Sequence, residues 1–523
     1  MIKKIKYRFN FYCFMLYLHM IKSVEKSDNS TSYLRSENEH LKDKILHLKE
    51  QLEWLRRQVF GQKSERFIDA ASKDELLPGL NLSAEAEKAL TEIIVPPHKR
   101  RKKKNGKNQF KVDIPDDLPR EKEIKDIPEE AKIDSKTGNK LVKIGDDIVE
   151  KLAYRPGSYY VRQLIYPKYA SKNNSLFGVV QSSSEDCVIE GSKFDPSFMA
   201  HIVTEKFAYH MPLNRIHEKL NYYNIKISPQ TLCGLVINLG HKIQTLCDLM
   251  KEELFSQKVL WTDDTHVDLI VNGAGKTKTA RIWGYIGGKP NAPPYHLYEF
   301  SSDRSERHPM SYLKNFSGIM HSDAYSAYEK IDSSDEYDIS WAACWAHARR
   351  KFDNSQNDPE FRVKILRLIR YLFLFERIAL VSDSERRIKI RQKDELKIVN
   401  IIFRMLKEKV KDNTLLPKSS LAEAIGYMLK RENNFRFYLN HSDARMDNNI
   451  AENGVRKVVI GRKNWLFVGS KKSGEAMANL LSLVQSCRAM KINPQDYLED
   501  IFKRLLSHPH KNLRELLPDQ WGH

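Results

Sequence analysis

The sequence predicts a multidomain α/β protein, and three observations lead to this fold class. Leucines recur every seven residues near the N-terminus, which predicts a coiled coil. Residues 257–345 contain short apolar runs between turns rich in Gly, Pro and Lys, which is typical of strands. Residues 353–440 carry the longer periodicity of helices. The 523 residues suffice for about three or four domains of ordinary size.

Composition limits the classes of partner and compartment. Lys and Arg number 87 and Asp and Glu 68, so the formal charge is +19 and favours a polyanionic partner, either nucleic acid or an acidic membrane surface. Charged residues at 30% and apolar residues at 41% exclude collagen-like and wholly disordered chains. The six cysteines include no C-x-x-C spacing, which argues against a disulfide scaffold or a zinc ribbon and favours a reducing, cytoplasmic compartment.

The N-terminal extension, residues 1–24, begins with basic residues and continues with an apolar stretch from Phe9 to Ile21. This outline imitates a signal peptide, but the stretch is shorter than the ~20 residues of a membrane-spanning helix and no small-residue cleavage site follows. We expect a disordered segment or a mis-assigned start, with Met20 as an alternative start. No other window predicts a membrane span.

Residues 25–67 predict a leucine-heptad coiled coil. A register of a and d positions runs over almost four heptads, with Asn38 at one a position, which favours a two-stranded parallel coil. One amphipathic helix packed on its own protein is the alternative. The residues assigned to the dimer seam are Leu34, Asn38, Leu41, Ile45, Leu48, Leu52 and Leu55.

Residues 68–112 lack a sustained period and predict a flexible basic linker. Its end, residues 96–111, holds eight Lys or Arg and no acid. Such a run is either a solvated tail or a phosphate-binding segment that acts by counterion release. The DNA-binding hypothesis names Lys99, Arg100, Arg101, Lys102, Lys103 and Lys104.

Two small modules follow the linker. Residues 113–190 predict a β-rich module of short, half-buried strands that include Tyr159, Val161 and Leu164-Ile165. Residues 191–250 predict a helix-turn-helix-like module, in which Ser228-Pro229 starts the second helix. Such patterns also occur in helical domains that do not bind DNA, so both interpretations stay open.

Carboxylates lie at the ends of two predicted buried strands. Asp263 closes the strand VLWTD and Asp323 closes GIMHSD, while Glu452 lies in a segment that can form a helical turn. Two such strands side by side would bring both aspartates together, which is unfavourable unless a cation lies between them. Three carboxylates are what a two-metal phosphoryl-transfer site requires, although each acid alone is more often a solvated carboxylate or a helix cap.

The motifs WTDDTHVDL, HSDAYSAY, CWAHARRKF, SLAEAIGYML and DNNIAENGVRKVVIGRKNWLFVGS occur in this order. Together they resemble the transposases of the insertion sequence 66 family, which belong to the DDE class. The heptads running into LRRQVFGQKSER, and PDDLPRE, YVRQLIYPKYA and EKFAYHMPLNRIHEKL, resemble the front part of that family. The resemblance covers about residues 30–505.

The resemblance implies a ribonuclease-H-like mixed-sheet catalytic core with an all-helical insertion. It implies that Asp263, Asp323 and Glu452 form the catalytic triad and hold Mg²⁺, for which Mn²⁺ may substitute. The implied reaction cuts DNA at element ends and joins the 3′ hydroxyl to target DNA. The implied partners are terminal inverted repeats, target DNA and a second or further copy of the chain, with accessory proteins of the element left open, at a cytoplasmic, nucleoid-associated location.

Two departures from the family pattern bear on these expectations. The middle region, where relatives often carry four zinc-binding cysteines, reads IDSKTGN and PKYASKNN, so we predict no zinc there. The residue after Asp263 is Asp264, where Glu would be expected, and strand alternation lets only one of the two face the site. Motif register favours Asp263.

Basic and aromatic residues flank the acids. Arg349, Arg350, Lys351, Arg456, Lys457, Arg462 and Lys463 are predicted to guide the DNA backbone, although a salt bridge within one helix would explain Arg456 equally. His347 contacts phosphate, orients a ligand or is a hydrogen-bonded core histidine, and Cys344 is interpreted as packing. Trp465 either stacks on an extruded base or packs in the core.

The sequence predicts nine segments and leaves two rival functions open. A DNA-binding protein without catalysis, or a nuclease that cuts without joining, remains an alternative to the transposase. The predicted segments are 1–24 extension, 25–67 coil, 68–112 linker, 113–190 β-rich module, 191–250 helix-turn-helix-like module, 251–352 first core part, 353–440 helical insertion, 441–490 second core part and 491–523 C-terminal helical tail.

Overall fold

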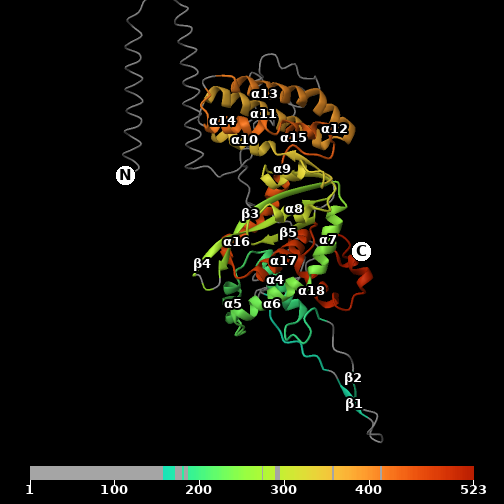
Figure 1. Cartoon of the computed structure of the whole chain (residues 1–523). Coiled ribbons are helices and arrows are strands. Elements are labelled where there is room, and N and C mark those ends of the chain that lie inside the picture. Colours follow the sequence, from blue (N-terminus) through green and yellow to red (C-terminus); the bar gives the residue numbers. More distant parts are fainter. Residues whose placement is uncertain are drawn as a thin grey trace, which may run out of the picture. The chain divides into compact units, whose positions relative to one another are not determined.

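A computed structural model gives the fold of most of the C-terminal two thirds of the chain (Figure 1). The residues that it describes are 157–165, 167–170, 179–181, 187–271, 273, 275–288, 295–355, 358–412 and 415–522. They belong to two compact units, one containing residues 349–375 and 397–429 and the other containing the remaining described residues. The N-terminal extension, the coiled-coil seam and the basic run at 99–104 lie outside the described residues.

A six-stranded mixed sheet forms the centre of the larger unit. Its main strands have the order β5-β4-β3-β6-β7, and the short β8 pairs with β3. β3 pairs antiparallel with β4 and parallel with β6, so the sheet combines a meander with a parallel half. The predicted mixed α/β core is confirmed. The strand bounds are β3 (Val259–Val271), β4 (Lys276–Gly287), β5 (Tyr295–Ser301), β6 (Gly318–Ser322), β7 (Ile339–Ala343) and β8 (Phe467–Val468).

One sequence prediction about this sheet is wrong. The strand VLWTD, which was expected to end at Asp263, continues to Val271 as the single strand β3, so Asp263 lies within a strand and does not close it. No Gly or Pro interrupts this run, and β4 pairs continuously with β3 from Leu260 to Val271. An unbroken ladder of hydrogen bonds therefore holds both sides of Asp263.

Two long helices pack against the antiparallel half of the sheet (Figure 1). α16 (Asn449–Trp465) packs on β3 and β4, and α17 (Lys471–Ala489) packs on β5. Glycines permit the close approach of α16: a Cβ at Gly454 would lie 2.0 Å from Ile286 Cδ1, and one at Gly284 would lie 2.9 Å from Val455 Cγ2. This packing fixes the first turn of α16 beside the middle of β3.

Among the described residues, four helices precede the sheet, and they include the two helices of the predicted helix-turn-helix-like module. Ser228 caps α6 by accepting a hydrogen bond from the Thr231 N–H, with Pro229 at the first helical position, as the sequence predicted. The predicted inward face of α6, Leu232, Leu235 and Val236, is buried. The helices are α4 (Pro196–Phe207), α5 (Leu213–Tyr222), α6 (Pro229–Lys242) and α7 (Gln244–Phe255).

The prediction of half-buried strands before these helices is wrong for residues 157–165. This segment has no regular structure, and Val161 is 86% and Ile165 82% exposed. No described strand pairs with this segment, so its alternating apolar residues do not pack in a sheet. The strands nearby are the antiparallel pair β1 (Lys168–Ala170) and β2 (Val179–Gln181).

Residues after β7 are mainly helical, and one buried arginine binds the loop that connects these helices to α16. Arg391 is fully buried, forms two hydrogen bonds with Glu376 and donates to the carbonyls of Tyr438, His441 and Ala444. It thereby fixes the loop that leads into α16. The elements are α10 (Trp345–Asn354), α11 (Pro359–Val381), α12 (Ser384–Ile390), π-helix η4 (Arg391–Glu395), α13 (Leu396–Val410), α14 (Ser420–Leu429), α15 (Glu432–Arg436) and 3-10 helix η5 (Phe437–Asn440).

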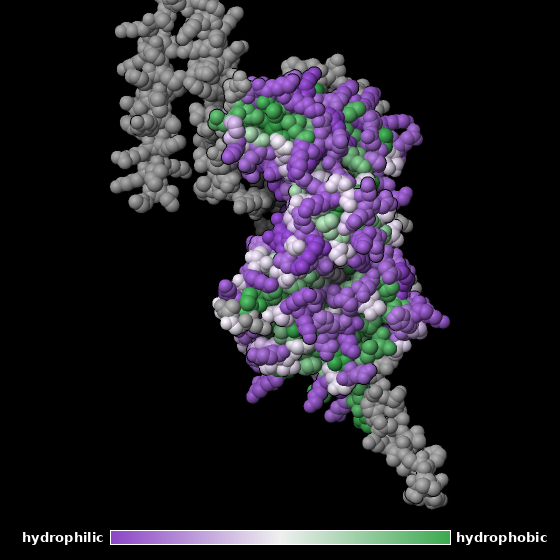
Figure 2. Space-filling view, viewed as in Figure 1, coloured by the Kyte–Doolittle hydropathy of each residue, from purple (hydrophilic) through white to green (hydrophobic). Residues whose placement is uncertain are grey.

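Short helices complete the fold, and polar residues cover much of its surface. α18 (Pro494–Arg504) packs on α4, and the remaining elements are α8 (Arg307–Leu313), α9 (Ser326–Asp332) and the 3-10 helix η6 (His510–Leu516). Figure 2 shows mainly hydrophilic residues on the visible face of each unit. Within the described part of the chain, every helix is too short or too polar to cross a bilayer.

Replacing Gly454 with Ala should destabilise the protein. The added Cβ would clash with Ile286 Cδ1, so Ile286 would have to change rotamer or α16 would have to shift from the sheet, at a cost of about 1–3 kcal/mol. Gly234→Ala is the matched control, because a Cβ there meets no atom within 4 Å. It should be neutral or stabilising by at most about 1 kcal/mol, since Ala favours a helix more than Gly. Urea denaturation monitored by tryptophan fluorescence measures both, and equal midpoints would contradict the packing.

Candidate active site

Asp263 is half-buried within β3, where the sheet holds its backbone on both sides. It pairs with Gly284 of β4 in the sheet register, and its Oδ1 accepts a hydrogen bond of 2.9 Å from the Asp264 N–H. Trp261 of the same strand stacks on His321 of β6, with ring centroids 5.4 Å apart. The carboxylate therefore projects from a rigid, apolar part of the sheet.

Asp323 directly follows β6, which lies parallel to β3 with Trp261 opposite His321. The sheet therefore brings the start of β3 and the end of β6 together, the adjacency that the sequence predicted for these two acids. The Asp323 Oδ1 accepts a hydrogen bond of 3.2 Å from the Tyr325 N–H, which fixes its orientation at the end of the strand.

Glu452 lies in the first turn of α16, and the residue that caps this helix ties it to β3. Asn448 is fully buried and its Nδ2 donates a hydrogen bond of 2.8 Å to the carbonyl of Thr262, the neighbour of Asp263. Its Oδ1 is also buried and accepts no hydrogen bond from the described residues, so a further donor or a cation would be stabilising there. The helix start is thus fixed beside the acids.

The three acids affect one another electrostatically. Burial, followed by the charges of Asp323, Asp264 and Glu452, raises the pKa of Asp263 to about 8, against the lowering effect of the Asp264 N–H. Burial, then Asp264 and Glu452, also raises the pKa of Asp323, while the Tyr325 N–H and Arg304 lower it. A divalent cation would relieve this repulsion, and the hard oxygen donors of the three carboxylates fit such an ion.

Asp264 has different contacts from its neighbour. Arg281 Nη1 lies 3.0 Å from one oxygen of Asp264, and Arg304 Nη2 lies 2.8 Å from the other. Both carboxylate oxygens are thus occupied by guanidinium groups, and Arg304 also lies over the ring of Tyr325 at 4.5 Å. This arrangement favours Asp263 as the metal-binding residue and leaves Asp264 to orient two arginines.

His347 and Cys344 lie beside Glu452. The His347 Nδ1 is 3.7 Å from the Glu452 Oε1, and the buried Cys344 Sγ accepts a hydrogen bond of 3.2 Å from the Asn448 N–H. Burial, then the charge of Asp447, raises the pKa of the Cys344 thiol to about 12. The His347 imidazole therefore lies directly beside one of the three acids.

The predicted DNA-binding cations are found in different environments. Arg462 donates to the Thr265 hydroxyl at 3.1 Å and to the His266 carbonyl, so it ties α16 to β3. Burial, then Arg488, lowers the pKa of the half-buried Lys457. Arg456 and Lys463 are exposed and form no ion pair with another described residue, which leaves them accessible to phosphate.

The remaining predicted residues lie in two other places. Arg349, Arg350 and Lys351 belong to the smaller unit, where Lys351 Nζ lies 4.8 Å from the centre of the Tyr427 ring. Trp465 is half-buried and packs beside Lys206 Nζ at 5.3 Å, where burial lowers the pKa of that lysine to about 8. The prediction that Trp465 stacks on a base stays untested by this arrangement.

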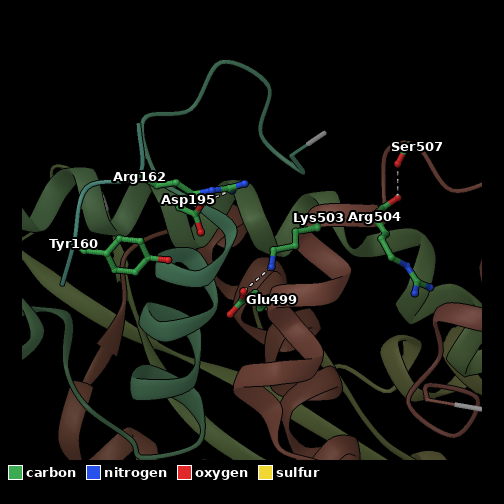
Figure 3. A pocket seen from close by; sticks show the side chains of 7 residues that line it. All are labelled: Tyr160, Arg162, Asp195, Glu499, Lys503, Arg504 and Ser507. Carbon is green, nitrogen blue, oxygen red and sulfur yellow. Dashed lines mark hydrogen bonds and ion pairs between the residues drawn. The ribbon is translucent and has the colours of Figure 1, made fainter. Parts of the chain in front are cut away.

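A surface cavity elsewhere contains none of the predicted site residues (Figure 3). It has a volume of about 490 Å³, and its acids are already paired, Asp195 with Arg162 at 3.1 Å and Glu499 with Lys503 at 2.6 Å. Its lining residues are Tyr160, Arg162, Asp195, Glu499, Lys503, Arg504 and Ser507. Because these charges neutralise one another, the acid cluster remains the stronger candidate site.

Sequence reasoning missed Arg281, Arg304 and Asn448. The two arginines lie 17 and 40 residues from Asp264 in the chain and meet it only through the fold. Asn448 belongs to the quoted motif DNNIAENG, so its presence beside Glu452 was visible but its hydrogen bond to β3 was not.

Asp263→Asn should stabilise the metal-free protein at alkaline pH. The pKa of Asp263 is raised to about 8, so the stability that its protonated form contributes is complete below about pH 4 and is lost as the pH rises through 8. In chelator, the variant should melt about 2–8 °C above the wild type at pH 8.5, as expected for ~1–2 kcal/mol. The difference should shrink at pH 5, and a pH-independent difference would contradict the raised pKa.

Family models match most of this sequence. The model described as "Transposase IS66 family" matches residues 191–476, and "IS66 C-terminal element" matches residues 482–518. The leucine-zipper model described as "Transposase C of IS166 homeodomain" matches residues 47–122.

Similar relatives occur in Sinorhizobium fredii (strain NBRC 101917 / NGR234). "Uncharacterized protein y4hP" is 30% identical over 514 residues, covering 91% of this chain and 89% of the relative. "Uncharacterized protein y4jD" is 28% identical over 501 residues, covering 92% and 96%, respectively. Since the first family model spans more than half of the sequence, the chain belongs to the Transposase IS66 family, with its DDE domain, C-terminal element and N-terminal leucine-zipper region.

Proposed function

We propose that the protein cuts DNA at the ends of an insertion sequence and joins the freed 3′ hydroxyl to target DNA. The observation that supports the proposal is electrostatic: the charges of Asp323 and Glu452 raise the pKa of Asp263, and the charge of Glu452 raises the pKa of Asp323. The strand order β5-β4-β3-β6-β7 supports a ribonuclease-H-like core.

The three carboxylates hold Mg²⁺ in this proposal, and Mn²⁺ can substitute. The bound metal supplies activation of the attacking oxygen and stabilisation of the leaving oxygen. The chain itself provides rigid placement of the acids: the sheet fixes Asp263 and Asp323, and the Asn448 hydrogen bond fixes the helix that carries Glu452. Rigid placement lowers the entropic part of the reaction barrier.

Cationic side chains near the acids bind the DNA backbone in this proposal. Arg304 forms an ion pair with Asp264 and lowers the pKa of Asp323. The Arg304 side chain remains 41% exposed. Arg456 and Lys463 add exposed charge along α16. These groups offset the repulsion between the acid cluster and phosphate.

Further DNA contacts come from the exposed face of α6 and from the basic run at 99–104. Gln230, Thr231 and Asn238 are exposed on the side of α6 opposite its buried leucines. Element ends are bound by a dimer or larger oligomer that the leucine heptads assemble.

Alanine replacement of Asp263, Asp323 or Glu452 should abolish strand transfer. Each change removes a metal ligand, so product formation from element-end DNA and Mg²⁺ should fall at least about 100-fold, the scale for losing one electrostatic component of an active site. Asp335→Asn is the control, because this exposed acid lies outside the cluster and should retain activity. Wild-type activity in any alanine variant would remove that residue from the proposed triad, and cleavage without joined product would favour a nuclease.

A lysine at a heptad d position should break the oligomer. Leu48→Lys places a charge in the seam, whereas Glu50→Lys places the same side chain at an outward f position. Light scattering after size exclusion should show a lower mass for Leu48→Lys alone. An unchanged mass in both variants would exclude assembly through these heptads.

A further inference from the structure

Cys344, His347 and Glu452 form a compact group of three different metal-binding side chains. One ligand atom from each, a sulfur, an imidazole nitrogen and a carboxylate oxygen, lies within 4.8 Å of the other two. Cys344 directly follows β7, His347 is in the first turn of α10, and Glu452 is in the first turn of α16. Three well-ordered elements therefore converge on one point.

The spacing of these atoms is close to that of a tetrahedral metal site. Metal–sulfur bonds of about 2.3 Å and metal–nitrogen or metal–oxygen bonds of about 2.0–2.1 Å separate ligand atoms by roughly 3.3–3.6 Å. The His347 Nδ1 and the Glu452 Oε1 are already 3.7 Å apart. Inward shifts of about 1 Å would complete the set, leaving the fourth position open.

Two backbone N–H groups stabilise the ionised, metal-bound sulfur, whereas burial raises the pKa of the metal-free thiol. The N–H of Asn448 donates to the Cys344 Sγ at 3.2 Å, and the N–H of His347 also donates to it. Hydrogen bonds from outside the ligand set orient metal ligands and stabilise their charge. Asp447 and Glu452 add negative charge beside the same atom, which a cation would neutralise.

We propose that Cys344, His347 and Glu452 bind one borderline-soft divalent cation of the Zn²⁺ class. A thiolate and an imidazole select such an ion over Mg²⁺, which prefers oxygen ligands. Binding forms the metal–sulfur bond and releases the thiol proton to solvent, with no change in oxidation state. This site differs from the middle module, for which the sequence predicted no zinc.

Occupation of the site would regulate the acid cluster, and this consequence rests on the proposed function. Glu452 would serve either the Zn²⁺-class ion or the Mg²⁺ site. Zn²⁺ should therefore inhibit Mg²⁺-dependent strand transfer, and raising the Mg²⁺ concentration should reduce the inhibition.

Cobalt binding to the reduced full-length protein without DNA tests the site itself. Co²⁺ reports a thiolate ligand through a sulfur-to-metal charge-transfer absorption in the near ultraviolet. The wild type should show this absorption, and the absorption should saturate at one ion per chain. Cys344→Ser should lose the absorption and weaken binding at least about tenfold, since even outer partners of a ligand contribute this much. Cys233→Ser, which alters an exposed cysteine, should retain both.

Absence of the absorption in the wild type, or its persistence in folded Cys344→Ser protein, would overturn the proposal. If circular dichroism shows that Cys344→Ser is unfolded, His347→Ala decides: unchanged cobalt affinity and spectrum in this variant would likewise overturn it. Because no DNA is present, a negative result here leaves the transposase proposal intact. Cobalt binding by a protein that lacks strand-transfer activity would instead contradict only the proposed function.

Discussion

Repulsion among half-buried carboxylates is the constraint that the core must accommodate. Asp263 and Asp323 would ordinarily be ionised well below neutral pH, but burial and their acidic neighbours raise the pKa of both. Such a cluster persists only if other interactions hold its members in place. The continuous pairing of β3 with β4, its parallel pairing with β6 and the docking of α16 supply these interactions.

The third acid depends most on tertiary contacts, because it is far from the others in sequence. The chain returns to the sheet through a loop whose carbonyls at Tyr438, His441 and Ala444 are bound by Arg391. Asn448 then ties the start of α16 to β3. Glu376 balances the charge of Arg391, and losing either partner would leave an unpaired buried charge, which costs about 3–5 kcal/mol. Arg391 and Asn448 thus help to position Glu452.

Local sequence patterns predicted individual helices and strands better than the contacts between them. Heptads, strand runs and the Ser228-Pro229 cap are encoded by neighbouring residues, and register alone favoured Asp263 over Asp264. The single long β3 was missed because Asp263-Asp264 resembles a strand end, whereas pairing with β4 carries the strand through both acids. Residues 157–165 gave the opposite error. Their alternating pattern predicted strands, but no described strand pairs with them.

Contacts between distant residues account for what the sequence could not reveal about the site. Nothing local to Asp264 indicates that Arg281 and Arg304 occupy its oxygens, and nothing local to Cys344 places Glu452 beside it. The resemblance to known transposases selected the three acids, but the different contacts of the two adjacent aspartates are visible only in three dimensions.

Binding of Mn²⁺ to the full-length protein, followed by electron paramagnetic resonance of the free ion, tests the central claim most directly. The wild type should remove Mn²⁺ from solution, and Asp263→Asn and Asp323→Asn should each weaken this binding by at least about tenfold, because each loses one charged oxygen ligand. The exposed-acid variant Asp335→Asn should bind as the wild type does. Equal Mn²⁺ affinity in all four proteins would show that the two aspartates do not form a common metal site.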